Sequence, residues 1–206
     1  MVRYIGPKNR VSRKFGINVF ARAKNPLVHK PNPPGMHGAK RKKKSDYGVQ
    51  LEEKQKLKAA FGMITEKQLV NYYQEAARHH KNTPEILMQA LECRLDNMVF
   101  RLKFASTPFQ AQQLVAHGHV MVNGKKVDRR SFKVKPGMEI SIKPASQKLK
   151  VVREAVESSN RSVPSYLEMH ASSCTGKLLQ LPSLADISIP LEVNINMICD
   201  FLAHSN

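Results

Sequence analysis

The chain has no tryptophan, and aromatic residues make up only 6% of its 206 residues. We therefore do not expect stacking of aromatic side chains on bases to be its main grip on a nucleic acid. No apolar run is long enough to span a bilayer. Residues 1–20 are polar and basic and lack the apolar core of a signal peptide, so we expect none.

Cysteine is also scarce, and the three cysteines, Cys93, Cys174 and Cys199, are far apart in the sequence. An odd count without a close pair argues against a disulfide framework or a zinc knuckle. Free cysteines fit a reducing compartment, where they act as small apolar residues. The histidines have no metal-ligand spacing either, and His79-His80 stand near an expected helix end, where imidazole suits the dipole. We expect no metal and no cofactor.

Acidic residues are outnumbered throughout the chain. There are 16 Asp and Glu against 34 Lys and Arg, which gives a net charge of +18, and the first acidic residue is Asp46. Such an excess destabilises a compact free protein through self-repulsion and calls for a polyanionic partner. Nucleic acid is the first candidate. We do not expect a membrane surface, because no amphipathic helix has the wide apolar face that it needs.

The acid-free segment, residues 1–45, is rich in Pro and Gly and has few, aperiodic apolar residues. Alone it cannot bury enough surface to offset the entropy lost on ordering. We interpret it as an extended basic arm that becomes ordered on RNA; the alternative is a disordered solubilising tail or a localisation signal. The RNA-binding candidates in the arm are Arg3, Lys8, Arg10, Arg13, Lys14, Lys40, Arg41, Lys42, Lys43 and Lys44.

Residues 46–92 have helical spacing of their apolar residues and predict a helical domain. Thr65 and Gln68 fit a capping box ahead of one of its helices. We expect residues 160–206 to complete this domain. Most of that segment mixes Pro, Ser and Gly with short apolar pieces, and a final element at 195–202 packs back on the first helices. The RNA-binding candidates in the helical domain are Tyr47, Lys54, Gln55 and Lys58.

Residues 93–158 form a third region, whose pattern is the most informative in the chain. The apolar residues from Leu95 to Leu102 have helical spacing, and Thr107-Pro108 starts a second helix, since Thr caps well and Pro fits the first turn. Gly118 ends that helix. A short strand follows, and Asn123-Gly124 is the strongest short hairpin signal. The candidates here are Arg94, Arg101, Gln113, His117, His119, Asn123 and Lys125.

The stretch from Thr107 to Val127 follows the pattern T-x-x-x-A-x-Q-L-V-x-H-G-H-V-x-V-N-G-x-x-V. In this it resembles the small RNA-binding module named after ribosomal small-subunit protein four, which also occurs in tyrosyl-tRNA synthetases and pseudouridine synthases. Gln112 departs from the family, which usually has Arg there, and this weakens one expected phosphate contact. The alternative is an ordinary helix-hairpin unit with a solvated basic face.

Other stretches extend the resemblance over the whole chain, to the bacterial form of the ribosomal small-subunit protein four family. They are the opening at 3–7, a turn at 34–38 and the block at 45–56. The resemblance implies an α+β protein with an extended basic N-terminal arm, a helical domain and an inserted helix-helix-β-hairpin module. Some family members hold zinc through arm cysteines, which this arm lacks. The C-terminal end, from 198 onward, departs from the family pattern.

The resemblance further implies a non-catalytic constituent of the small ribosomal subunit, in the cytoplasm or an organelle. Such a protein is an early, primary binder of the five-prime domain of small-subunit ribosomal RNA that nucleates assembly. It contacts small-subunit proteins five and three, bears on decoding accuracy, and has neither a membrane nor a small-molecule substrate as partner. Two alternatives stay open: a free RNA-binding chaperone, and an RNA-modifying protein that carries the module as an accessory domain.

Overall fold

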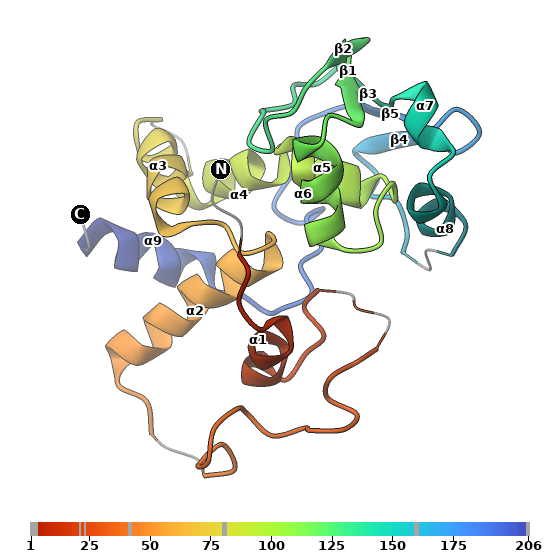
Figure 1. Ribbon diagram of the computed structural model, residues 1–206. Helices are drawn as coiled ribbons and strands as arrows, with labels where there is room; N and C mark the ends of the chain where they lie inside the picture. The colour runs from red at the N-terminus through yellow and green to blue at the C-terminus, as the bar shows by residue number, and fades with distance from the viewer. Residues whose placement is uncertain are drawn as a thin grey trace. The chain divides into compact units, whose positions relative to one another are not determined.

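A computed structural model describes residues 4–20, 22, 24–40, 43–79, 82–158 and 161–204. The chain folds as two compact units, each with its own core (Figure 1). The first unit combines Met1–Leu87 with Ile189–Asn206, and the second is formed by Met88–Ser188. The second unit therefore extends well past residue 158, where we expected the module to end.

Helices make up the regular structure that is described in the first unit. They are α1 (Lys8–Phe15), α2 (Asp46–Ala60), α3 (Glu66–Ala77), the first half of α4 (Thr83–Glu92) and α9 (Ile195–His204). The predicted cap of α3 is confirmed, because the Thr65 side chain accepts a hydrogen bond from the Gln68 N–H at 3.4 Å. The α9 helix packs against α2 and α3, as predicted for the last element, and buries Ile198, Phe201 and Leu202.

The arm is not simply extended, which corrects our expectation. Lys8–Phe15 forms the α1 helix, which carries Arg13 and Lys14 in its last turn, where cations suit the helix dipole. Gly16, with a φ of 68°, ends the helix in the left-handed conformation. Val19 and Phe20 follow and are buried. A helix stop followed by two large apolar residues therefore anchors a segment whose overall composition is typical of disorder.

The second unit is built on a five-stranded antiparallel sheet with the order β2-β1-β3-β5-β4. Its strands are β1 (Val120–Val122), β2 (Lys125–Lys126), β3 (Glu139–Ile142), β4 (Leu167–His170) and β5 (Thr175–Leu178). We did not predict the β4–β5 hairpin. Gly176 weakens the strand pattern, yet a Cβ there would lie 2.4 Å from Leu102 Cδ2, so only glycine allows this close packing. Pairing of β5 with β3 draws residues 161–188 into this unit.

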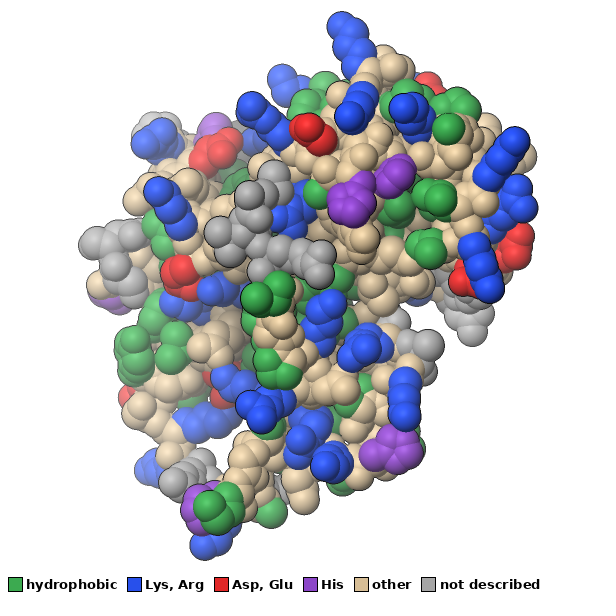
Figure 2. All heavy atoms as spheres, viewed as in Figure 1, with side chains coloured by type: hydrophobic (Ala, Val, Ile, Leu, Met, Phe, Trp, Pro, Cys, Tyr) green, Lys and Arg blue, Asp and Glu red, His purple; other side chains and the backbone are tan. Residues whose placement is uncertain are grey.

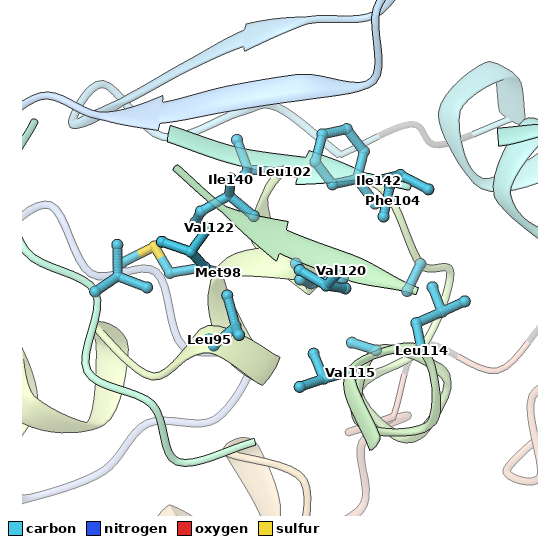
Figure 3. Close-up of a cluster of buried hydrophobic side chains, with 14 of the residues drawn as sticks. Leu95, Met98, Leu102, Phe104, Leu114, Val115, Val120, Val122, Ile140 and Ile142 are labelled. Atoms are coloured by element: carbon cyan, nitrogen blue, oxygen red, sulfur yellow. The ribbon is translucent and has the colours of Figure 1, made fainter. Parts of the chain in front are cut away.

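Helices α5 (Leu95–Arg101) and α6 (Pro108–Ala116) pack together and against the sheet to form the core (Figure 3). Alternate residues of β1 and β3 point into it, because strand side chains alternate between faces. Two short helices, α7 (Pro144–Gln147) and α8 (Lys150–Ser158), follow β3 in the sequence. The side chains that meet in Figure 3 include Leu95, Met98, Leu102, Leu114, Val115, Val120, Val122, Ile140 and Ile142.

The predicted hairpin turn between β1 and β2 is confirmed. Asn123 and Gly124 have φ values of 47° and 75°, the positive values that a type I′ turn requires at both central positions. The Asn123 side chain also accepts a hydrogen bond from the Glu139 N–H at 2.9 Å. The turn is therefore tied to the neighbouring strand β3, and it fixes the direction in which Lys125 leaves.

Substitution of Gly124 tests this turn. Among the described residues no atom lies within 4 Å of an added Cβ, so any loss reflects the positive φ rather than a clash. Gly124→Val should lower the free energy of unfolding by about 1 kcal/mol or more, measured by urea denaturation. Gly124→Asn is the matched control and should lose much less, because Asn tolerates the left-handed conformation. Equal stability of the two variants would contradict the turn assignment.

Candidate nucleic-acid interface

The end of α6, the turn after it and the β1–β2 hairpin carry a group of polar and basic side chains that we call the hairpin surface. It consists of Gln113, His117, His119, Lys125 and Lys126. His119 is partly buried and the other four are exposed. The Lys126 side chain lies across Gly118, where a Cβ would come within 2.2 Å of Lys126 Cε. Gly118 thus serves both the helix stop, with a φ of 72°, and the placement of this lysine.

His119 is the best-oriented member of the hairpin surface. Its Nδ1 lies 2.8 Å from the hydroxyl of buried Ser146, and its carbonyl accepts a hydrogen bond from the Lys143 N–H at 2.8 Å. The His117 ring lies 6.1 Å away, centroid to centroid. Because Nδ1 is held by Ser146, Nε2 is the ring nitrogen that can meet a phosphate.

Arg94 and Arg101, which we expected to bind RNA, are paired with acidic side chains inside the second unit. Arg94 is buried, and its Nε and Nη2 donate to Asp96 at 3.1 and 2.9 Å. Arg101 donates to both carboxylate oxygens of Glu92, at 2.6 and 3.2 Å. Charges removed from water require such partners. The acidic residues on either side of Arg94 in the sequence were the signal that could have indicated these internal roles.

The Glu92 carboxylate has no solvent exposure and is the centre of a buried polar cluster. The Tyr166 hydroxyl donates to Glu92 Oε1 at 2.6 Å. Burial, and then the charge of Glu92, raise the pKa of Tyr166 far above its usual value, so the phenol keeps the proton that it donates. Burial by itself would lower the pKa of Arg101, but the Glu92 carboxylate raises it. The cluster is structural and keeps Arg101 charged inside the fold.

Arg161 is an internal residue that the sequence pattern did not single out. Its guanidinium donates to the carbonyls of Phe100 and Ala105 at 3.2 and 2.7 Å and lies 4.0 Å from the centre of the Phe100 ring. Burial, and then repulsion from Arg101, lower the pKa of Arg161 to about 10. It joins the segment before β4 to the end of α5 and the loop that follows. The sequence carries no local signal for this contact.

Among the candidates on α2, Lys54 is largely internal. Its ammonium lies 2.6 Å from Glu66 and 4.4 Å from the centre of the Phe201 ring, and the residue is 8% exposed. Lys58 binds the other oxygen of the same carboxylate at 2.7 Å. Burial acts to raise the pKa of Glu66, but hydrogen bonds from the two lysines lower it overall. Two ammonium groups thus share one carboxylate, which leaves one net positive charge.

Tyr47 is exposed, and its ring lies 5.4 Å from that of Phe201, centroid to centroid. Gln55 is partly exposed and accepts a hydrogen bond from Lys14 of α1. The structure therefore brings Lys14, Gln55 and Lys58 toward one part of the first unit. Tyr47 lies at the other end of α2, near its N-terminus.

The arm candidates divide into internal and exposed cations. The Arg13 guanidinium donates to the carbonyls of Lys30, Asn32 and Pro33 at 3.0 to 3.4 Å, and so holds that loop. Lys44 pairs with Glu52. Arg3, Arg41 and Lys42 lie outside the described residues, and Lys8 is partly buried. The exposed arm candidates are Arg10, Lys14, Lys40, Lys43 and Lys44.

Two basic residues that we did not choose as candidates, Lys126 and Arg130, belong with the hairpin. Lys126 follows Lys125 in β2 and is exposed. The Arg130 Nη1 donates to the side-chain oxygen of buried Gln112 at 3.2 Å. A guanidinium therefore stands beside the position at which the resemblance leads us to expect Arg. The run of basic residues after the Asn-Gly turn was the sequence signal for both.

The arrangement suits binding of a polyanion. On the face shown in Figure 2, Lys and Arg side chains are widespread and acidic ones are few. Within the described ranges, no group of three or more His, Cys, Asp or Glu could hold a metal ion. In the same part of the chain, every helix is too short or too polar to cross a membrane.

Comparison with known proteins identifies two matching families. Residues 3–92 match the ribosomal protein S4/S9 N-terminal domain, and residues 93–140 match the S4 domain. The chain is 60% identical over 205 residues to small ribosomal subunit protein uS4 of Protochlamydia amoebophila, with 100% of both chains covered. It is 57% identical over 207 residues to uS4 of Chlamydia muridarum and 55% identical to uS4 of Chlamydia pneumoniae, with 99% of each chain covered.

Because some cations are internal and others are exposed, we expect substitutions at the two kinds of site to affect different properties, stability or RNA binding. Glu92→Gln strips Arg101 of its buried partner and should lower the free energy of unfolding by about 3 kcal/mol or more in urea denaturation. Lys125→Ala with Lys126→Ala should change stability by less than about 0.5 kcal/mol per substitution, since both side chains are exposed. The lysine variant should instead bind RNA more weakly. The reverse pattern, with stability lost at the lysines and kept at Glu92, would contradict this division.

Proposed function

The chain belongs to the uS4 family of small ribosomal subunit proteins, and we propose that it binds the five-prime domain of small-subunit ribosomal RNA early in assembly. Membership makes it a structural, RNA-binding constituent of the small subunit. The observation that carries the proposal is the hairpin surface, which sets exposed cations and an oriented histidine on the rigid core of an S4 domain.

Two kinds of contact follow from the distribution of charge. Exposed arm cations neutralise closely spaced phosphates and supply affinity that does not depend on sequence. The hairpin surface is small and held by its neighbours, so it recognises the shape of a folded RNA junction. A net charge of +18 supports a partner as highly charged as ribosomal RNA.

We infer the finer roles from the family resemblance. They are nucleation of subunit assembly, contacts with small-subunit proteins five and three, and through these contacts an influence on decoding accuracy. The ribosome concerned is cytoplasmic or organellar. Against the alternative of a modifying enzyme, the match to a uS4 protein covers 100% of this chain and 100% of that relative. No observation favours a free RNA chaperone.

Sedimentation of cell extract tests the proposal directly. The chain should travel with the small subunit in a sucrose gradient and should stay there through a high-salt wash, detected by immunoblotting. A free RNA chaperone would leave the particle at high salt. Isolation of the chain only in low-mass fractions would overturn the proposed function.

The role of the arm is tested by the salt dependence of binding. Each phosphate that a protein neutralises makes log affinity fall by roughly 0.7 to 0.9 per unit of log salt. Deletion of residues 1–44 should therefore weaken binding to the five-prime-domain RNA and flatten this slope. Replacing exposed Lys125 alone is the matched control and should reduce the slope by only about one unit. An unchanged slope after the deletion would mean that the arm makes no phosphate contacts.

A further inference from the structure

We propose that a hollow between α1 and α2 takes a single unstacked nucleotide of RNA, an inference that rests on the RNA-binding function proposed above. The hollow has a volume of about 220 Å³. The described residues that line it all belong to the first unit. It is lined by Val11, Lys14, Phe15, Gln55, Lys58 and Met63.

The apolar part of the lining suits the flat face of a base. Phe15 contributes a partly buried ring from the last turn of α1, and Val11 lies one helical turn before it. Every base has a π-face, so stacking on a ring is tolerant of sequence. Lys14 Nζ lies 5.5 Å from the centre of the Phe15 ring, which places a cation beside the stacking surface.

Met63 is held in a conformation that side-chain-bearing residues rarely adopt. Its φ is 61°, and it follows Gly62, whose φ is 68°. The Met63 N–H donates to the Lys58 carbonyl at 2.8 Å, and this bond fixes the turn after α2. A turn needed only for reversal would favour Gly or Asn at this position. Strain of this kind gathers at ligand sites, and here it supplies a soft, adaptable thioether to the wall.

The polar part of the lining suits the edge and the phosphate of the same nucleotide. The Gln55 amide can both donate to and accept from a base edge, and it already accepts a hydrogen bond from Lys14. Lys58 shares Glu66 with Lys54, so that group keeps one net positive charge, and Lys14 adds another. None of the described residues that line the hollow is acidic. A ring, an amide and two ammonium groups match the face of the base, its edge and the phosphate of a nucleotide.

Ultraviolet cross-linking of the full chain to five-prime-domain ribosomal RNA tests the proposal. Trypsin cuts after Lys14 and Lys58, so the two walls fall on the separate peptides 15–22 and 59–67. Mass spectrometry should find a nucleotide adduct on one or both of them. Cross-links at the hairpin peptides but at neither of these would overturn the proposal and leave the proposed function intact. Failure to bind the RNA at all would instead overturn the proposed function.

A second measurement asks whether the base itself is bound. Replacing the cross-linked nucleotide by an abasic one should weaken binding of the unaltered chain on the order of tenfold. The Phe15→Leu variant keeps an apolar wall but lacks the π-face. It should therefore bind the intact RNA about as weakly as the unaltered chain binds the abasic RNA. Removing the base should weaken RNA binding by this variant little further. Phe132→Leu, at a similarly half-buried ring in the second unit, is the control and should keep the full abasic effect.

Met63→Gly separates binding from folding. The change removes one wall and also relieves the positive φ, so the thermal midpoint should hold or rise while RNA affinity falls several-fold. A purely structural role for Met63 would lower the midpoint and leave affinity unchanged. The proposal is overturned if the abasic RNA binds the unaltered chain as tightly as the intact RNA does. It is also overturned if a protein, rather than a nucleotide, protects the two peptides in the assembled subunit.

Discussion

The buried carboxylate of Glu92 is the constraint on which the second unit depends. It accepts hydrogen bonds from Arg101 and from Tyr166, and so it joins the end of α4, the end of α5 and the segment that leads into β4. A carboxylate without water must have its partners in place, which leaves these three segments little freedom. The β4–β5 hairpin is thereby fixed, β5 supports β3, and β3 holds the turn that presents the hairpin surface.

Some basic residues of the chain form internal ion pairs and others are exposed, and the residues around each one determine which role it has. Arg94 and Arg101 have acidic residues close by in the sequence and fold inward with them, as Lys54 does with Glu66. The hairpin lysines follow a tight turn, where the chain must face solvent, and stay outside. The total of 34 Lys and Arg therefore overstates the number of cations available to RNA. The useful count is of the cations that remain after those paired with internal carboxylates are removed.

Features set by a few adjacent residues could be predicted from the sequence. The caps at Thr65 and Thr107 and the Asn-Gly turn are of this kind. The α+β class, in contrast, was implied by the family resemblance. The β4–β5 hairpin could not be predicted, because its evidence is a close approach of Gly176 to Leu102, far apart in sequence. The burial of Arg101 depends in part on a distant residue, since Tyr166 completes the Glu92 cluster from a distance of 74 positions. Arg94 instead pairs with Asp96, two positions away, and its burial had a local signal that we did not use. The assignment of exposed residues to RNA contacts remains a prediction.

The first unit takes its helices from both ends of the chain, and this has a consequence for the order of events during synthesis. Its last helix, α9, packs on α2 and α3 but is translated after everything else. Residues 88–188 are all synthesised sooner, so the second unit requires no residue of α9 in order to fold. The hairpin of the second unit could thus be in place before α9 packs on the helices of the first unit. Premature termination near the end would spare that hairpin and leave the amino-terminal helices without their cover.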